Sequence, residues 1–241
     1  MDQHAFRGRF LGVLGGMGPM AGAAFMARLV ALTQAASEQA HIPAILWNDP
    51  RIPDRPAGHA GSGPDPWPWM LNGLRRLEQA GAQAIAVPCN TAHLWHERMA
   101  AATHLPVLHI VEAVADDLDR KGIRHARIGL MGTATTLRLG LYQRVLEARG
   151  HTCVLLDDAE HEVFCAAPIA LVKANRMRQA CEPALEGVRL LVARGAQAVV
   201  LGCTELPLAV PQDRREEAGV PVSDSIDALA LAAISWYEGR G

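Results

Sequence analysis

Short apolar runs alternate with longer stretches of mixed polarity along the whole chain. The apolar runs favour β-strands, which we expect at residues 10–14, 44–47, 84–87, 107–109, 127–131, 152–156, 198–201 and 220–223. The stretches between them favour helices, which we expect at residues 20–36, 68–80, 91–102, 112–120, 137–149, 177–194 and 226–237. Because the predicted strands are apolar on both faces, helices should cover both sides of mostly parallel sheets. The pattern therefore predicts an α/β fold.

The sequence also contains an internal duplication. An apolar run that ends in Cys89 has a counterpart that ends in Cys203, at an offset of 203 − 89 = 114 residues. Each half opens on an apolar strand with glycines, at residues 11–15 and at residues 128–132. A unit of this length is a small domain rather than a solenoid repeat. We therefore expect two pseudo-symmetric lobes, each a mostly parallel sheet flanked by helices, with the active site in the cleft between them.

The two matched cysteines are the candidate catalytic residues. Both follow the carboxyl end of a predicted strand and precede a helix start, which is where parallel sheets bind ligands and where a thiol pKa is lowered. The N-cap residue types Asn90, Thr91 and Thr204 indicate free backbone N–H groups that suit a carboxylate. If one thiol is ionised and the other protonated, one removes a proton from a carbon while the other donates to its opposite face. Such a pair inverts the carbon.

Other interpretations of the same residues stay open. Buried cysteines after strands are often inert packing residues, as we expect for Cys153, Cys165 and Cys181. Cys89 and His93 have the i, i+4 spacing of two metal ligands, although no histidine follows Cys203. We interpret His93 as a hydrogen-bonded neighbour that orients the site or supports it structurally.

The glycine-rich segment at residues 12–19 suggests a dinucleotide site, with Asp49 as a ribose-binding acid. Its spacing is not GxGxxG, however, and Pro19 lacks an N–H for a pyrophosphate. The glycines are better explained by close approach of the backbone to a small ligand.

Composition narrows the class of protein. The chain has 241 residues, half of them hydrophobic, and a net charge of −2 without a basic stripe, which argues against a nucleic-acid partner. No apolar run is long enough to span a membrane, and the first residues lack the features of a signal peptide. Five cysteines without a CxxC pair indicate reduced thiols. We therefore expect a cytoplasmic protein with no membrane or nucleic-acid partner.

Two cationic residues are candidates to hold a second carboxylate. Arg55 lies in a long segment rich in proline and glycine, residues 48–66, which is placed to cover the cleft. Lys173 follows an apolar run at residues 169–172 that should draw it inward.

Five motifs together resemble the aspartate/glutamate racemase family, and its aspartate racemase branch most. They are Gly15-Gly16-Met17-Gly18-Pro19, Ile52-Pro53-Asp54-Arg55, Pro88-Cys89-Asn90-Thr91-Ala92-His93, Gly132-Thr133-Ala134-Thr135-Thr136 leading to Gly140-Leu141-Tyr142-Gln143, and Gly202-Cys203-Thr204-Glu205-Leu206-Pro207-Leu208. The resemblance covers nearly the whole chain and implies a racemase that needs no cofactor and no metal. It also implies a homodimer, and a last helix that packs against the first lobe. The first lobe would then comprise residues 1–112 and 225–241, and the second residues 113–224.

The resemblance further assigns roles to individual residues. It implies that Cys89 and Cys203 are the two acid/base residues. The other implied roles are the following: Asn90, Thr91 and Thr204 hold the α-carboxylate, Met17 lines the site, and Thr133, Thr136, Arg55 and Lys173 hold the side-chain carboxylate.

Three functions are therefore compared. The first is an isomerase that interconverts L- and D-aspartate, or glutamate, by two-base proton transfer, with an acidic amino acid as its small-molecule partner. The second is a maleate-type cis-trans isomerase or another racemase of the same superfamily. The third is a dicarboxylate-binding module without turnover. Two thiols favour an enzyme, because arginine and backbone amides suffice for binding alone.

Overall fold

A computed structural model describes residues 9–240. Residues 1–8 and 241 lie outside the described residues, so the expectation about the first residues of the chain is not addressed by the structure. Within residues 9–240, no helix has both the length and the apolar character needed to cross a membrane.

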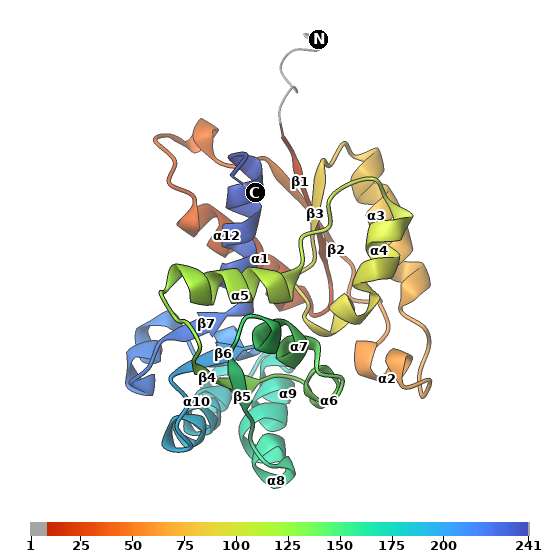
Figure 1. The fold of residues 1–241 in the computed structure, drawn as a ribbon. Coiled ribbons are helices and arrows are strands. Elements are labelled where there is room, and N and C mark those ends of the chain that lie inside the picture. Colours follow the sequence, from red (N-terminus) through yellow and green to blue (C-terminus); the bar gives the residue numbers. More distant parts are fainter. Residues whose placement is uncertain (1–8, 241) are drawn as a thin grey trace.

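The chain alternates strands and helices from end to end (Figure 1). The first half contains β1 (Leu11–Gly15), α1 (Pro19–Leu32), η2 (Glu38–Ala40), β2 (Ala44–Asn48), α2 (Arg55–His59), α3 (Trp67–Gln79), β3 (Ala84–Ala86), η3 (Thr91–Trp95), α4 (His96–Ala102) and α5 (Ile110–Arg120). The second half contains β4 (Arg127–Met131), α6 (Ala134–Arg138), α7 (Leu141–Ala148), β5 (Thr152–Val154), α8 (Asp158–His161), η4 (Glu162–Ala166), α9 (Ala167–Lys173), α10 (Met177–Ala193), β6 (Ala198–Leu201), α11 (Leu206–Ala209), η5 (Gln212–Ala218), β7 (Val222–Asp224) and α12 (Ser225–Tyr237).

Two parallel sheets confirm the predicted α/β fold with two lobes. Their strand orders are β2-β1-β3 and β5-β4-β6-β7, so the first three strands of each half are arranged identically. The fourth strand is complete only in the second sheet, where Val199 pairs with Val222. At the matching place in the first sheet, the predicted strand at residues 107–109 is reduced to a single parallel bridge between Ile85 and Val107.

Matching glycines let helices approach both central strands. A Cβ atom on Gly12 of β1 would lie 2.9 Å from the Cβ of Ala82, and one on Gly129 of β4 would lie 3.0 Å from the Cβ of Leu191. Cβ atoms do not pack at such distances, so only glycine allows the flanking segments to lie this close. The repeated glycine of the sequence is thus explained by packing against the sheet.

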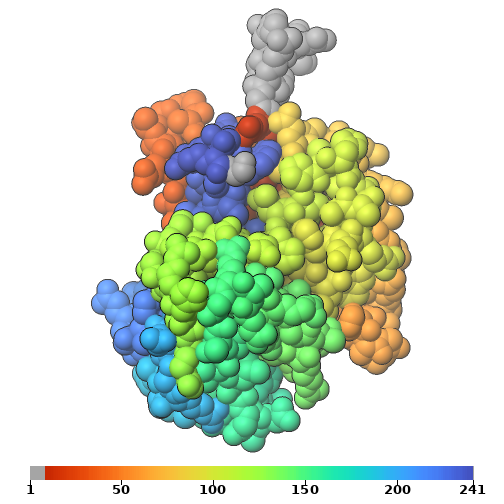
Figure 2. Space-filling view, in the orientation of Figure 1, coloured from red at the N-terminus to blue at the C-terminus, as the bar shows by residue number. Residues whose placement is uncertain are grey.

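The core shows how the two lobes are joined. Helices α5 and α12 lie between the two sheets, and α12 packs against both α1 and α5 (Figure 1). One apolar cluster extends from β1 through these two helices to β4 and β6. A separate cluster fills the outer side of each lobe. Accordingly, the blue C-terminal residues lie among the red and orange N-terminal residues in Figure 2. The lobes therefore share one helical layer, formed by α5 and α12.

Some predicted elements differ from the observed ones. The helix expected at residues 91–102 is a 3₁₀ turn followed by α4, and the helix expected at residues 137–149 is divided at Gly140, which has φ +66°. Helices α8 and α9 were not predicted. Asp157 starts α8 with a capping box that includes Glu160, and one π-type turn joins α8 to α9.

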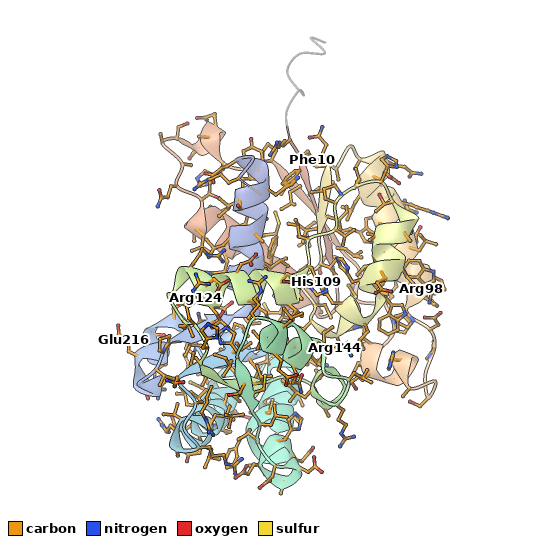
Figure 3. The ribbon with its side chains drawn as sticks, viewed as in Figure 1. Phe10, Arg98, His109, Arg124, Arg144 and Glu216 are labelled. Carbon is orange, nitrogen blue, oxygen red and sulfur yellow. The ribbon has the colours of Figure 1, made fainter. Side chains whose placement is uncertain are left out.

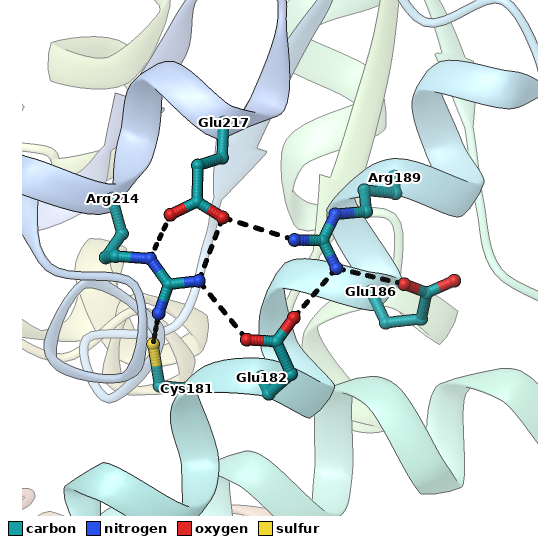
Figure 4. A network of polar contacts seen from close by, with 6 residues as sticks. All are labelled: Cys181, Glu182, Glu186, Arg189, Arg214 and Glu217. Atoms are coloured by element: carbon teal, nitrogen blue, oxygen red, sulfur yellow. Dashed lines mark hydrogen bonds and ion pairs between the residues drawn. The ribbon is translucent and has the colours of Figure 1, made fainter.

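A network of charged residues connects α10 with η5 on the surface of the second lobe. Arg189 and Arg214 lie between three carboxylates, and Arg214 also donates to the sulfur of Cys181 (Figure 4). All of these charged side chains are at least one-third exposed, so each ion pair contributes little to stability. Its carboxylates include that of Glu186, whose side chain is 45% exposed.

Candidate active site

Cys89 and Cys203 occupy equivalent places at the carboxyl ends of β3 and β6. Their exposed fractions are 5% and 4%, so both thiols are buried to the same extent. All five cysteines are free thiols, and Cys165 is a core residue whose Sγ donates to the Gly132 carbonyl, as expected of a packing residue.

The expectation that helix starts lower both thiol pKa values is wrong. Burial raises the pKa of the Cys89 thiol, and it raises that of Cys203 well above the ordinary value. The helical segments after the thiols, η3 and α11, are short, and no side chain caps either. Desolvation of a thiolate therefore outweighs the helix-terminus effect.

Arg55 is the charged group beside Cys89. It begins α2, whose N-cap Asp54 accepts a hydrogen bond from the Ala57 N–H, so a short helix orders part of the predicted loop. The Arg55 Nη1 atom donates to the carbonyls of Ile52 and Pro53, at 3.0 and 2.8 Å. Its charge acts against burial to lower the pKa of the Cys89 thiol. Arg55 is only 8% exposed, and its Nε has no partner in the protein.

Glu205 is the charged group beside Cys203. The Cys203 Sγ donates to Glu205 Oε2 at 3.0 Å, and both residues are buried. After burial, this carboxylate is the main cause of the raised Cys203 pKa, and it raises the pKa of Cys89 as well. A Cβ atom on Gly18 would lie 3.4 Å from Glu205 Oε1, so the side chain reaches across to the glycine-rich segment of the first lobe. One carboxylate therefore lies close enough to influence both thiols.

Threonine hydroxyls join the two lobes next to Cys89. The Thr91 Oγ1 lies 3.1 Å from the Oγ1 atoms of both Thr133 and Thr136, and the last two lie 2.9 Å apart. These three predicted site residues are brought together across the lobes. Their hydroxyls satisfy one another.

Asn90 forms a second link between the lobes. Its Nδ2 donates to the Ser225 hydroxyl at 2.9 Å, and its Oδ1 accepts from the Tyr142 hydroxyl at 2.5 Å. The structure thus uses the Asn90 side chain to fix the segment after Cys89 against α7 and α12, and the predicted N-cap role is not found. Burial raises the pKa of Tyr142, which keeps this donor neutral.

A cavity of about 530 Å³ opens between the lobes, lined by Arg55 and Glu205 but by neither cysteine. The charged residues that line it are Asp54, Arg55, Lys173 and Glu205. The rest of its wall comprises glycines, Asn175 and the apolar residues Pro19, Met20, Ala21, Ala23, Pro50, Ile52, Val172 and Leu208. Two cations on opposite lobes, Arg55 and Lys173, are thus placed at one opening, and their role in holding a carboxylate stays a prediction.

The remaining predicted site residues occupy different surroundings. Thr133 and Thr136 are not among the residues that line this cavity. Met17 is 2% exposed and packs in the same apolar cluster as Cys89, and Thr204 is buried beside Cys203, with its hydroxyl 3.5 Å from Glu205 Oε2.

His93 supports the backbone of Cys89. Its Nε2 accepts from the Ile110 N–H at 3.1 Å, which assigns the ring proton to Nδ1, and Nδ1 then donates to the Cys89 carbonyl at 2.8 Å. The ring also contacts those of His96 and His109, and His109 lies at the start of α5 in the middle of the molecule (Figure 3). Both nitrogens of His93 are therefore used by backbone groups. Across residues 9–240, no group of three or more metal-ligating side chains is arranged to hold a metal ion.

We predict that this histidine cluster makes stability depend on pH. Burial is the main cause that lowers the pKa of His93 to about 3 and that of His109 to about 4, from 6.5. The contribution of these two neutral histidines to the free energy of unfolding is complete above pH 6.5. It is lost as the pH falls toward 4, because the unfolded chain takes up these protons first. Urea unfolding between pH 7 and 5 should show this loss, at roughly 1.4 kcal/mol per pH unit for each proton.

The variant His93→Gln tests the assignment. Its free energy of unfolding should fall less steeply with decreasing pH than that of the wild type, and the difference in slope should correspond to one proton. His104→Gln is the matched control, because that ring is exposed. Equal slopes for the two variants would contradict the assignment to His93.

The dinucleotide interpretation is not supported, because the carboxylate of Asp49 already has a partner within the protein. Arg51 donates two hydrogen bonds to this carboxylate, both at 2.8 Å, which leaves it paired at the end of β2. A Cβ atom on Gly16, which has φ +93°, would lie 2.2 Å from the Asp49 carbonyl oxygen. The glycine at this position is thus needed for contact with the protein's own backbone.

Sequence reasoning missed Glu205, Tyr142 and Ser225. Glu205 follows the Cys203-Thr204 pair directly, and this proximity to a candidate thiol was the available signal. Tyr142 and Ser225 reach Asn90 from 52 and 135 residues away, and no local pattern indicates such contacts.

Comparison with known proteins defines the class to which this fold and site belong. The model of the Asp/Glu/hydantoin racemases matches residues 14–233. The broad specificity amino-acid racemase RacX of Bacillus subtilis (strain 168) is 27% identical over 233 residues, which are 94% of this chain and 97% of that protein. The aspartate racemase of Picrophilus torridus has a TM-score of 0.84 and 30% identity, with 96% of this chain and 95% of that chain covered. An aspartate racemase homologue from Pyrococcus horikoshii OT3 has a TM-score of 0.76 and 25% identity, with 95% and 99% covered.

The chain belongs to the Asp/Glu/hydantoin racemase family, and the resemblance inferred from its motifs is confirmed. Racemases are isomerases, so the protein is an enzyme of that class.

Proposed function

We propose that the protein interconverts L- and D-aspartate, or glutamate, by two-base proton transfer between Cys89 and Cys203. The observation that carries the proposal is a pair of equally buried thiols at equivalent strand ends, both influenced by the Glu205 carboxylate that lies between the lobes. A thiolate on one side of Cα would remove the proton, and the thiol on the other side would protonate the opposite face.

The polar groups of the cavity support an acidic substrate. Arg55 presents a buried Nε without a partner, and Lys173 lines the same cavity from the other lobe. Two cations suit two carboxylates, and a guanidinium binds a carboxylate through more than one N–H. Once they exchange partners, the hydroxyls of Thr91 and Thr204 are further donors for the α-carboxylate, and those of Thr133 and Thr136 for the side-chain carboxylate.

A racemase of wider specificity is the second candidate. Its support is the apolar wall of the cavity, including Met20, Ile52 and Leu208, which gives room to side chains longer than that of aspartate. The Bacillus subtilis relative is named for broad specificity. A panel of L-aspartate, L-glutamate, L-methionine and L-lysine, each assayed for its D-enantiomer, separates the two candidates by their relative kcat/KM.

We predict that racemisation needs neither a metal nor pyridoxal phosphate. The purified protein should form D-aspartate from L-aspartate at an unchanged rate after treatment with a chelator and without added cofactor, because two thiols supply both proton transfers. Formation of fumarate from maleate, without any D-amino acid, would instead support the cis-trans isomerase. Activity lost to the chelator and restored by zinc would contradict the proposed mechanism.

A further inference from the structure

The two thiols have neighbours of opposite charge. Cys89 lies beside the Arg55 guanidinium, in the same apolar cluster as Ile52, whose carbonyl holds Arg55 in place. Cys203 instead donates its proton to the Glu205 carboxylate at 3.0 Å. Since the exposed fractions of the two thiols differ by one percentage point, burial does not distinguish them. The difference lies in the charges.

We infer that Glu205 holds the proton on Cys203 in the resting enzyme, so that Cys89 is the thiol that begins turnover as the base. This inference rests on the proposed two-thiol racemisation. A cation next to Cys89 stabilises its thiolate, whereas a carboxylate in contact with Cys203 disfavours a second negative charge there. Glu205 is thus a positioning residue that makes KM and kcat differ between the two enantiomers.

The other groups around Cys203 do not reverse this order. Lys173 lowers the pKa of the Cys203 thiol, but its effect is smaller than those of burial and Glu205, and its side chain is exposed to solvent. The Tyr142 ring packs against Gly202, next to Cys203, and its hydroxyl is neutral and donates to Asn90. Glu205 also raises the pKa of Cys89, although there Arg55 opposes it more strongly.

The proton balance of one turnover follows from this arrangement. The Cys89 thiolate takes the proton from Cα and becomes a thiol, and the electron pair left on Cα takes the proton of Cys203. The product enzyme then has a Cys203 thiolate next to the Glu205 carboxylate. Release of a proton from Cys89 to water and uptake of one by Cys203 restores the resting form. Of the two singly ionised forms, the one with a Cys89 thiolate is the more populated and serves the enantiomer whose Cα–H faces Cys89. The other enantiomer needs the less populated form with a Cys203 thiolate.

Thiol alkylation of the free protein tests this inference without any substrate. We would treat the full-length protein with iodoacetamide from pH 6 to 11 and quantify each cysteine by peptide mass spectrometry. The pH of half-maximal rate reports when each thiol ionises, independently of its accessibility. It should be higher for Cys203 than for Cys89. In Glu205→Gln, the Cys203 midpoint should fall by about one pH unit or more, and by more than that of Cys89.

Glu205→Asp and Glu186→Gln complete the alkylation test. The shorter carboxylate of Glu205→Asp should give a Cys203 midpoint between those of the wild type and Glu205→Gln. Glu186→Gln removes a surface carboxylate of α10 and should leave both midpoints unchanged. Equal midpoints in the wild type, or a Cys203 midpoint that does not move in Glu205→Gln, would overturn the inference. If Glu205→Gln does not fold, the order of the wild-type midpoints still decides the question.

Steady-state kinetics give a second readout. Enantiomers have equal free energies in water, so kcat/KM must be the same in both directions. KM can differ between the two enantiomers only if kcat differs by the same factor. The apparent KM of each enantiomer is its intrinsic value divided by the fraction of enzyme that can bind it. Glu205→Gln should therefore lower the KM of the enantiomer that meets Cys203 relative to that of the other. An unchanged KM ratio would contradict the inference, whereas absence of racemisation in the wild type would contradict the proposed function and leave the alkylation result standing.

Discussion

Replacing Cys89 or Cys203 by serine should reduce racemisation by about 10³-fold or more, because each thiol supplies one of the two proton transfers. A serine hydroxyl is far too weakly acidic to supply the base at neutral pH. Serine has nearly the volume of cysteine and can make the same polar contact, so the variants should fold. The measurement is the rate of D-aspartate formation from L-aspartate, followed with a chiral assay.

Cys181→Ser is the matched control for these variants. Cys181 is a half-buried thiol at the surface network of the second lobe, where it accepts from Arg214. Its replacement should leave racemisation at the wild-type rate. A Cys203→Ser enzyme that racemises at that same rate would rule out the two-thiol mechanism.

Isotope incorporation tests the same mechanism in the wild type. In deuterated water, the inverted product should carry solvent deuterium while substrate recovered early stays mostly protiated. The reason is that the donating thiol has exchanged with solvent, whereas the abstracting thiol still holds the substrate hydrogen. Equal early labelling of substrate and product would indicate a single exchanging base.

Replacing Arg55 by lysine should lower kcat/KM for aspartate by about 30-fold or more, since loss of a buried charged donor typically costs about 2–5 kcal/mol. A lysine cannot donate to both the Ile52 and Pro53 carbonyls and also present a planar guanidinium to a carboxylate. The loss should be smaller for alanine, which has no side-chain carboxylate. Inhibition by succinate should weaken in parallel with the loss for aspartate.

Arg51→Lys is the control for the arginine variant. Arg51 lies four residues away in the same segment, but its side chain is 78% exposed and pairs with the buried Asp49. This variant should retain wild-type kinetics. Equal losses of aspartate and alanine turnover in Arg55→Lys would confine the role of Arg55 to the Cys89 thiol and place the side-chain carboxylate elsewhere.

Most strands were predictable because they are buried on both faces and therefore continuously apolar. β1, β4 and β6 lie within one residue of their expected ranges. The segment at residues 152–156 pairs only as far as Val154, because the end of a strand depends on its neighbour rather than on its own composition. The segment from 157 to 173 was not recognised as helical, since capping by Asp157 and packing of α9 on the second core determine it.

The sequence by itself determined the duplication, the α/β class and the two thiols, because a repeated motif keeps its residue types at a fixed spacing along the chain. It also placed Arg55 and Lys173 as candidate cations, and both line the cavity between the lobes. Only the tertiary structure decided which groups surround each thiol. Arg55 is held near Cys89 within the first lobe by the Ile52 and Pro53 carbonyls, and the local backbone after Cys203 turns the Glu205 carboxylate onto that thiol. Because electrostatic interactions depend on distance and desolvation rather than on order along the chain, the opposite charges beside two similar motifs could not be predicted from the sequence alone.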